Sequence, residues 1–107
     1  MIRVRFSIGN NRLHGFEIKG HSMSAPEGQD IICASVSSAA FMAANTITEI
    51  IGIPARAEAE SGSMVFYPEE VNENTEAVLR GLELHLTELS KQYPLNIKVI
   101  YGGVKNA

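Results

Sequence analysis

The 107-residue sequence has one cysteine and no tryptophan, and aromatic residues make up only 7% of it. A single cysteine excludes an internal disulfide, which fits a reducing compartment. With 9 basic against 12 acidic residues, the net charge is −3. The basic residues are scattered along the sequence, with only Arg3 and Arg5 as a local pair, and binding of a phosphate backbone relies on clustered Lys and Arg, so we expect no direct nucleic-acid binding.

Long apolar runs are also missing. The N-terminus alternates apolar and polar residues and lacks the apolar region of a signal peptide. No stretch approaches the roughly 18 uninterrupted apolar residues of a membrane span. We therefore expect a cytoplasmic protein without a membrane partner.

The overall amino-acid composition is typical of a globular protein. Hydrophobic residues make up 45% of the chain and charged residues 20%, which is ordinary for a folded domain. The length fits one domain over residues 1–107. One cysteine and three dispersed histidines show no metal-ligand spacing, and the glycines form no phosphate-binding loop. We expect neither a metal nor another cofactor.

Hydrophobic periodicity predicts five strands and two helices. Alternation and turn residues place strands at 2–8, 12–19, 55–60, 63–67 and 96–101, and apolar residues at helical spacing place helices at 31–51 and 72–92. The order β-β-α-β-β-α-β is typical of an α+β fold. We predict a two-layer domain with a mostly antiparallel sheet and both helices on one face.

The predicted buried stripe of the first helix is rich in small residues. It consists of Ile32, Val36, Ala39 or Ala40, Ala43, Ile47 and Ile50. Small residues permit a close approach, so we expect this helix to lie flat on the sheet. On the first strand, the alternation places Arg3, Arg5 and Ser7 on the solvated face.

The segment 20–37 carries the chemistry. Asp30 is a suitable N-cap for the first helix, so Cys33 falls in its first turn, where unpaired N–H groups and the helix dipole favour a thiolate. His21 ends the preceding strand and could serve as the proton shuttle of a Cys–His pair. Ser37 lies one turn after Cys33 and faces the same way. Asp30 could instead orient His21.

On the residues alone, a second interpretation stays open. A lone cysteine in an apolar helix is commonly a buried small hydrophobe. A histidine such as His21, taken by itself, is more commonly an ordinary loop or strand-end residue. His14 and His85 lie on a strand and a helix, and we interpret both as non-catalytic.

A resemblance favours the catalytic interpretation. Gly20-His21, a short loop, and then Gly28-Gln29-Asp30-Ile31-Ile32-Cys33-Ala34-Ser35-Val36-Ser37 resemble the signature of the ribosomal-processing cysteine protease (Prp) family. Chain length and element order are similar too. Ser22 stands where many members have Ala, and we expect this difference to be tolerated because both residues are small.

The resemblance implies a cysteine endopeptidase in which His21 and Cys33 are catalytic. It implies removal of a short N-terminal extension from a bacterial large-subunit ribosomal protein, with cleavage after an aromatic residue, and a homodimer. We expect amides near Cys33 and Ala34 to hold the oxyanion. A mobile 22–30 loop, including Ser22, Met23 and Gly28, would cover the peptide.

Three alternatives remain at this point. The chain could be a non-enzymatic, ribosome-associated assembly or interaction module. It could be a thiol-transfer protein, which would need an intermolecular partner because no second cysteine is present. It could also be a catalytically idle homologue.

Overall fold

A computed structural model describes residues 1–21 and 30–104. The elements are β1 (Ile2–Gly9), β2 (Arg12–Lys19), α1 (Ile31–Asn45), a π-helical segment η1 (Thr46–Ile51), β3 (Ala55–Glu60), β4 (Ser63–Pro68), α2 (Glu73–Gln92) and β5 (Ile97–Gly103). The predicted order is confirmed. Boundaries differ mainly because β1, β4 and β5 each extend by one or two residues beyond the predicted ends.

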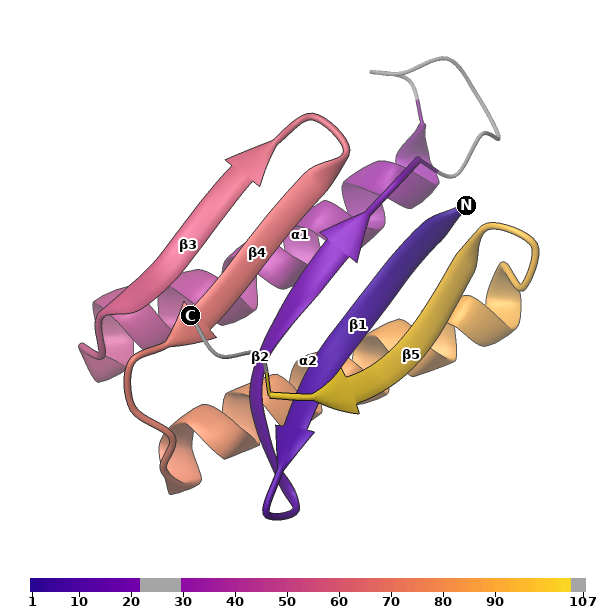
Figure 1. The fold of residues 1–107 in the computed structure, drawn as a ribbon. Helices are drawn as coiled ribbons and strands as arrows, with labels where there is room; N and C mark the ends of the chain where they lie inside the picture. The colour runs from indigo at the N-terminus through magenta and orange to yellow at the C-terminus, as the bar shows by residue number, and fades with distance from the viewer. Residues whose placement is uncertain (22–29, 105–107) are drawn as a thin grey trace.

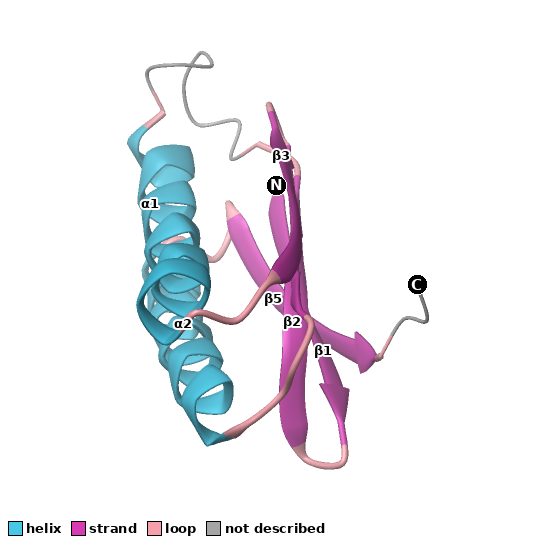
Figure 2. Ribbon diagram, turned by 90° about the vertical axis from the view of Figure 1, so that its left-hand side faces the viewer, coloured by secondary structure: helices cyan, strands magenta, loops and turns pink. Residues whose placement is uncertain are grey.

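The five strands form one sheet in the order β3-β4-β2-β1-β5. β1 pairs antiparallel with β2 and parallel with β5, while β4 pairs antiparallel with both β2 and β3. Both helices cover the same face of this sheet, as Figures 1 and 2 show. The predicted two-layer α+β fold with a mostly antiparallel sheet is therefore confirmed.

The core lies between the sheet and the helices. Its centre is a row of aromatic side chains, in which Phe16 lies 6.2 Å from Phe6 and 5.6 Å from Phe66, measured between ring centroids. All three side chains have 0% exposure. Because the strands alternate, these rings share one face of the sheet and join it to the helix layer.

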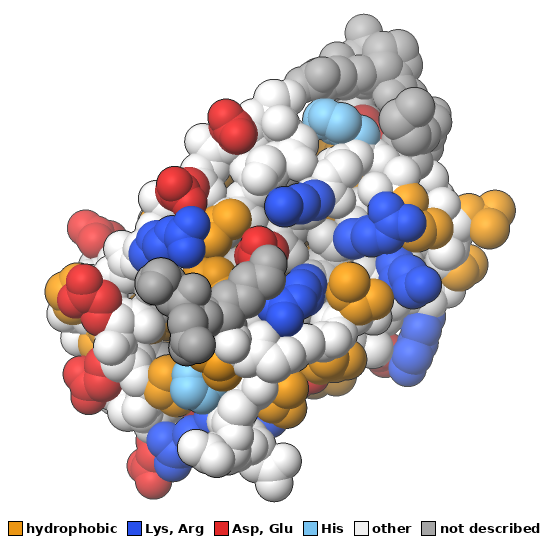
Figure 3. All heavy atoms as spheres, in the orientation of Figure 1, with side chains coloured by type: hydrophobic (Ala, Val, Ile, Leu, Met, Phe, Trp, Pro, Cys, Tyr) orange, Lys and Arg blue, Asp and Glu red, His pale blue; other side chains and the backbone are white. Residues whose placement is uncertain are grey.

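The outer face of the sheet is polar, but it is less solvated than the sequence suggested. Figure 3 shows basic side chains gathered over this face. Arg3 is exposed as predicted, whereas Ser7 is fully buried. The prediction for Ser7 was wrong because Arg5 donates a 2.8 Å hydrogen bond to its hydroxyl and the Tyr67 hydroxyl also lies 2.8 Å from it. Side chains from β1 itself and from β4, two strands away, thus cover this position.

The first helix does not keep one geometry over its predicted length. Beyond Asn45 it continues as η1, in which the Gly52 N–H donates to the carbonyl of Ile47, five residues back, at 3.0 Å. A π turn rotates the following side chains away from the 3.6-residue stripe. Ile47 is therefore buried, but Ile50 is 80% exposed, and its predicted burial was wrong.

The α1–η1 segment is unusually apolar. By length and composition alone, Ile31–Ile51 is apolar enough to cross a membrane, with a mean hydropathy of 1.5. The expectation that no stretch approaches a span therefore has this one exception among the described residues. In the fold, Val36, Ala40 and Ala43 of this segment pack in the core against the sheet. Their burial gives the apolar composition a structural role.

The second helix is fixed at its start by a reciprocal cap. The Asn72 side chain accepts from the Thr75 N–H at 3.0 Å, and the Thr75 hydroxyl accepts from the Asn72 N–H at 2.9 Å. One turn after Asn72, the Glu76 carboxylate accepts from the Leu13 N–H at 2.7 Å. This bond ties α2 to the β1–β2 hairpin.

Candidate active site

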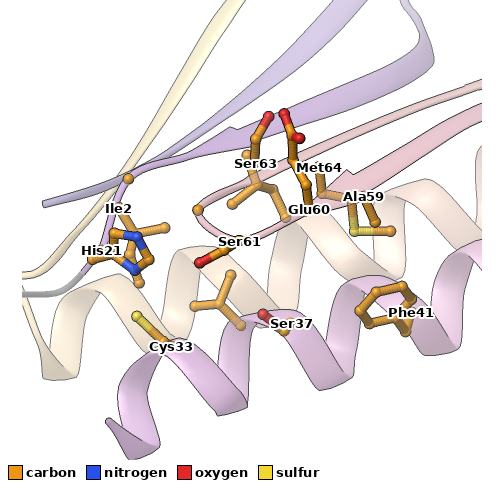
Figure 4. Close-up of a pocket in the computed structure, with 14 residues that line it drawn as sticks. Ile2, His21, Cys33, Ser37, Phe41, Ala59, Glu60, Ser61, Ser63 and Met64 are labelled. Atoms are coloured by element: carbon orange, nitrogen blue, oxygen red, sulfur yellow. The ribbon is translucent and has the colours of Figure 1, made fainter. Parts of the chain in front are cut away.

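A pocket of about 210 Å³ opens where three chain segments meet. It is bounded by the end of β2 with His21, the first turns of α1 with Cys33 and Ser37, and the β3–β4 turn with Ser61 and Gly62. In Figure 4, the sulfur of Cys33 points toward the imidazole of His21. The fold thus brings both residues of the predicted pair to one cavity.

Cys33 occupies a capped helix start. The Asp30 side chain accepts from the N–H of Ile32 at 2.9 Å and from that of Cys33 at 3.3 Å. The prediction that Asp30 caps this helix is confirmed. The second carboxylate oxygen, Oδ2, accepts from the Cys33 sulfur at 3.4 Å. The carboxylate therefore lies directly beside the candidate nucleophile.

His21 follows the last ladder residue of β2 and is held near the β3–β4 turn. Lys19 pairs with Ser63 at the end of the β2–β4 ladder. The Gly20 N–H then donates to the Gly62 carbonyl at 2.9 Å. This bond extends the pairing of β2 with β4 by one residue beyond the ladder, to Gly20, which directly precedes His21.

The other end of the pocket is apolar. Phe41 of α1, Met64 of β4 and Ala59 of β3 line it, and Val36 lies between this end and Cys33 along the helix. Figure 4 shows Phe41 and Met64 on the side away from His21. An apolar side chain bound beside Cys33 would find its hydrophobic contacts here.

The remaining predicted residues divide into three groups. Ser37 lines the pocket as expected. Ala34 does not: it lines the groove between α1 and α2, and its N–H already donates to the Asp30 carbonyl at 3.1 Å. The amide of Ala34 thus already has a hydrogen-bond partner within the helix. Ser22, Met23 and Gly28 lie outside the described residues, as does nearly all of the 22–30 loop.

The sequence did not predict that the β3–β4 hairpin lines one side of the pocket. Glu60, Ser61, Gly62 and Ser63 line the pocket from the β3–β4 connection. Ser61 and Gly62 are the turn residues between the predicted strands 55–60 and 63–67, but a turn signal is local and does not say which element the turn faces. That information comes from the strand order, which places β4 directly beside β2.

Comparison with known proteins assigns the chain to a class. Residues 1–98 match the sequence model of the family described as "Cysteine protease Prp". The match covers nearly the whole chain and includes the pocket. The protein is therefore a cysteine protease, and it belongs to the Prp family.

Individual relatives agree with this assignment. The ribosomal processing cysteine protease Prp of Bacillus subtilis is 29% identical over 91 residues, which cover 78% of this chain and 81% of that protein. The fold is similar to that of the Staphylococcus aureus processing protease Prp with a covalently linked product peptide, with a TM-score of 0.88 and 21% identity over 95% of this chain and all of the other. A complex of S. aureus Prp with a substrate peptide gives a TM-score of 0.81 at 20% identity, with 95% of this chain and 100% of the other covered.

Proposed function

We propose that Cys33 is the nucleophile and His21 the general base of this protease. The observation that carries the proposal is that both side chains face one pocket, one from the start of α1 and the other from the end of β2. A helix N-terminus favours negative charge at the sulfur, and a neighbouring imidazole accepts the thiol proton. No other cysteine is present to serve as the nucleophile.

The reaction follows from these two groups. His21 takes the thiol proton, and the Cys33 thiolate adds to the scissile carbonyl carbon. The C–N bond breaks, and the imidazolium returns the proton to the leaving amine. His21 then activates a water molecule, which hydrolyses the thioester and regenerates the Cys33 thiol. The positive end of the α1 dipole stabilises the oxyanion of each tetrahedral intermediate.

The proposed substrate is the short N-terminal extension of a bacterial large-subunit ribosomal protein, with the cut after an aromatic residue. The names of the relatives and the family resemblance support a ribosomal substrate. The apolar end of the pocket, with Phe41 and Met64, supports an aromatic side chain next to the cleaved bond. Processing of such a substrate would take place in the cytoplasm.

A peptide spanning such an extension, incubated with the protein and analysed by mass spectrometry, tests the proposal. We expect one cut after the aromatic residue and none with Cys33→Ala, because the nucleophile is gone. Ser90→Ala is the matched control, since Ser90 lies on α2 and lines neither this pocket nor the α1–α2 groove. Cleavage by Cys33→Ala at the wild-type rate would refute the role of Cys33.

We also propose that the protein is a homodimer and that its helix layer forms the interface. A groove of about 900 Å³ runs between α1 and α2 and has no Asp, Glu, Lys or Arg in its lining. At its edge, Met42 is 65% exposed. An uncharged apolar surface suits an isologous contact with a second copy of itself.

Analytical ultracentrifugation tests the dimer. Met42→Glu should shift wild-type dimer to monomer, because it would bury a carboxylate against apolar surface. Leu95→Glu is the control: Leu95 is also exposed, at 84%, but does not line the groove. A wild-type monomer at micromolar concentration, or a Met42→Glu dimer of unchanged affinity, would contradict this interface.

A further inference from the structure

The β3–β4 turn approaches the imidazole of His21 more closely than a side chain would allow. Two residues, Ser61 and Gly62, connect the last ladder pair Glu60 and Ser63. Gly62 has a φ of +74°, in the left-handed region that favours glycine. A Cβ placed on Gly62 would lie 2.7 Å from Nε2 of His21, 3.3 Å from Cε1 and 3.4 Å from Cδ2.

These distances show that the ring packs against the bare backbone of the turn. Any L-residue other than glycine at this position would push the imidazole away, because real Cβ atoms do not approach a heavy atom to 2.7 Å. The turn itself has little freedom to retreat. Its Gly62 carbonyl accepts from the Gly20 N–H at 2.9 Å, and Ser63 pairs with Lys19 in the β2–β4 ladder.

We infer that Gly62 is a positioning residue, whose missing side chain leaves the space in which the His21 imidazole reaches Cys33. The inference rests on the proposed Cys33–His21 pair and assigns it a third participant on a different strand connection. Gly62 acts on the reaction through the position of the imidazole ring.

The chemical consequence follows from the geometry of proton transfer. Nucleophile and base must lie within hydrogen-bond reach, and a displacement of about 1 Å costs up to roughly a hundredfold in rate. An imidazolium held beside a sulfur also favours the thiolate. Displacing the ring should therefore slow the reaction and move thiolate formation to higher pH.

The chain offers a matched control for the backbone strain. Gly52, after η1, has a φ of +84°, and a Cβ placed there meets nothing within 4 Å. Gly52→Ala and Gly62→Ala place alanine in the same region of backbone space, so their strain should be similar. Only Gly62→Ala adds a group against the imidazole. Gly52→Asn and Gly62→Asn repeat the comparison with a residue that tolerates positive φ better, in case alanine prevents folding.

The experiment measures the rate of Cys33 alkylation by iodoacetamide from pH 5 to 10, with thermal unfolding as the check on folding. We expect Gly62→Ala and Gly62→Asn to shift the midpoint of the rate–pH curve upward, toward that of His21→Ala. The rate at neutral pH should fall by about tenfold. The Gly52 variants should match the wild type. A purely structural role would lower the melting temperature without moving this midpoint.

The outcomes separate the inference from the proposed function. If the Gly62 variants fold and alkylate as the wild type does, while His21→Ala is slowed, Gly62 does not position the ring and the Cys33–His21 pair stands. If His21→Ala itself has the wild-type curve and still cleaves peptide, the pair is wrong and the inference falls with it.

Discussion

Replacing Asp30 separates two effects of one carboxylate. Oδ1 caps α1 through the N–H groups of Ile32 and Cys33, and Oδ2 lies 3.4 Å from the Cys33 sulfur. Asp30→Asn keeps an oxygen acceptor at the cap and removes the negative charge. Asp30→Ala removes both. The two variants should therefore differ in stability but share an increase in thiol reactivity.

The structure sets the expected magnitudes. Loss of an N-cap costs about 0.5–2 kcal/mol, and we expect about 2 kcal/mol for Asp30→Ala because a buried cap leaves its donors without water. Asp30 is only 7% exposed. For Asp30→Asn we expect less than about 0.5 kcal/mol, since Asn and Asp are comparable caps. Two negative charges at this separation repel by about 1.2 kcal/mol even with full water screening, so removing the carboxylate charge should speed the reaction of Cys33.

Iodoacetamide alkylation at pH 7 and urea unfolding measure the two effects separately. We expect Asp30→Asn to alkylate at least about fivefold faster than the wild type, at nearly unchanged stability. A slower reaction of Asp30→Asn would refute the reasoning. It would mean that the carboxylate acts through His21, whose orientation it would then support, rather than on the sulfur.

Two further predictions concern the scaffold. Burial raises the pKa of Glu76, but hydrogen bonds from Arg80 and the Leu13 N–H outweigh it and leave this pKa below its usual value of 4.5. The stability that Glu76 contributes is therefore present above about pH 4.5 and is lost as the pH falls through the lowered pKa. In urea unfolding, Glu76→Gln should cost about 1 kcal/mol at pH 7 and less at pH 3; an equal cost at both would contradict this. Phe66→Ala should cost about 3–5 kcal/mol, because it leaves a cavity beside Phe16; a loss below about 1 kcal/mol in the same assay would contradict the packing described.

The fold could be predicted from the sequence because its signals are local and agree with one another. Alternation in β1, the Asp30 cap of α1 and the helical spacing of apolar residues in α2 each point to the element that forms. The predictions that failed concern features that local sequence patterns do not determine. Ile50 is exposed because η1 changes the helical repeat, and Ser7 is buried because the Tyr67 side chain reaches it from β4.

The site was predictable only in part, for a related reason. Cys33, Asp30 and His21 belong to one continuous segment, so a motif could name them. The residues opposite them, from Glu60 to Ser63, come from a hairpin that joins the site through the pairing of β4 with β2. Ala34 was misplaced because sequence adjacency to Cys33 does not decide which side of the helix faces the pocket.

The two members of the proposed pair are held by different parts of the fold. Cys33 is fixed from its own helix, through the Asp30 cap. His21 follows a strand whose end is bonded to the β3–β4 turn. Because the two supports come from different segments of the chain, their substitutions should add nearly independently in stability. In reactivity they should not add, since each changes the same charge balance at one sulfur. We therefore expect the double variant of Asp30→Asn and Gly62→Ala to show additive changes in unfolding free energy but non-additive changes in the alkylation rate. This result would mean that both substitutions act on Cys33. Additive changes in the logarithm of the alkylation rate would mean that they act on separate groups.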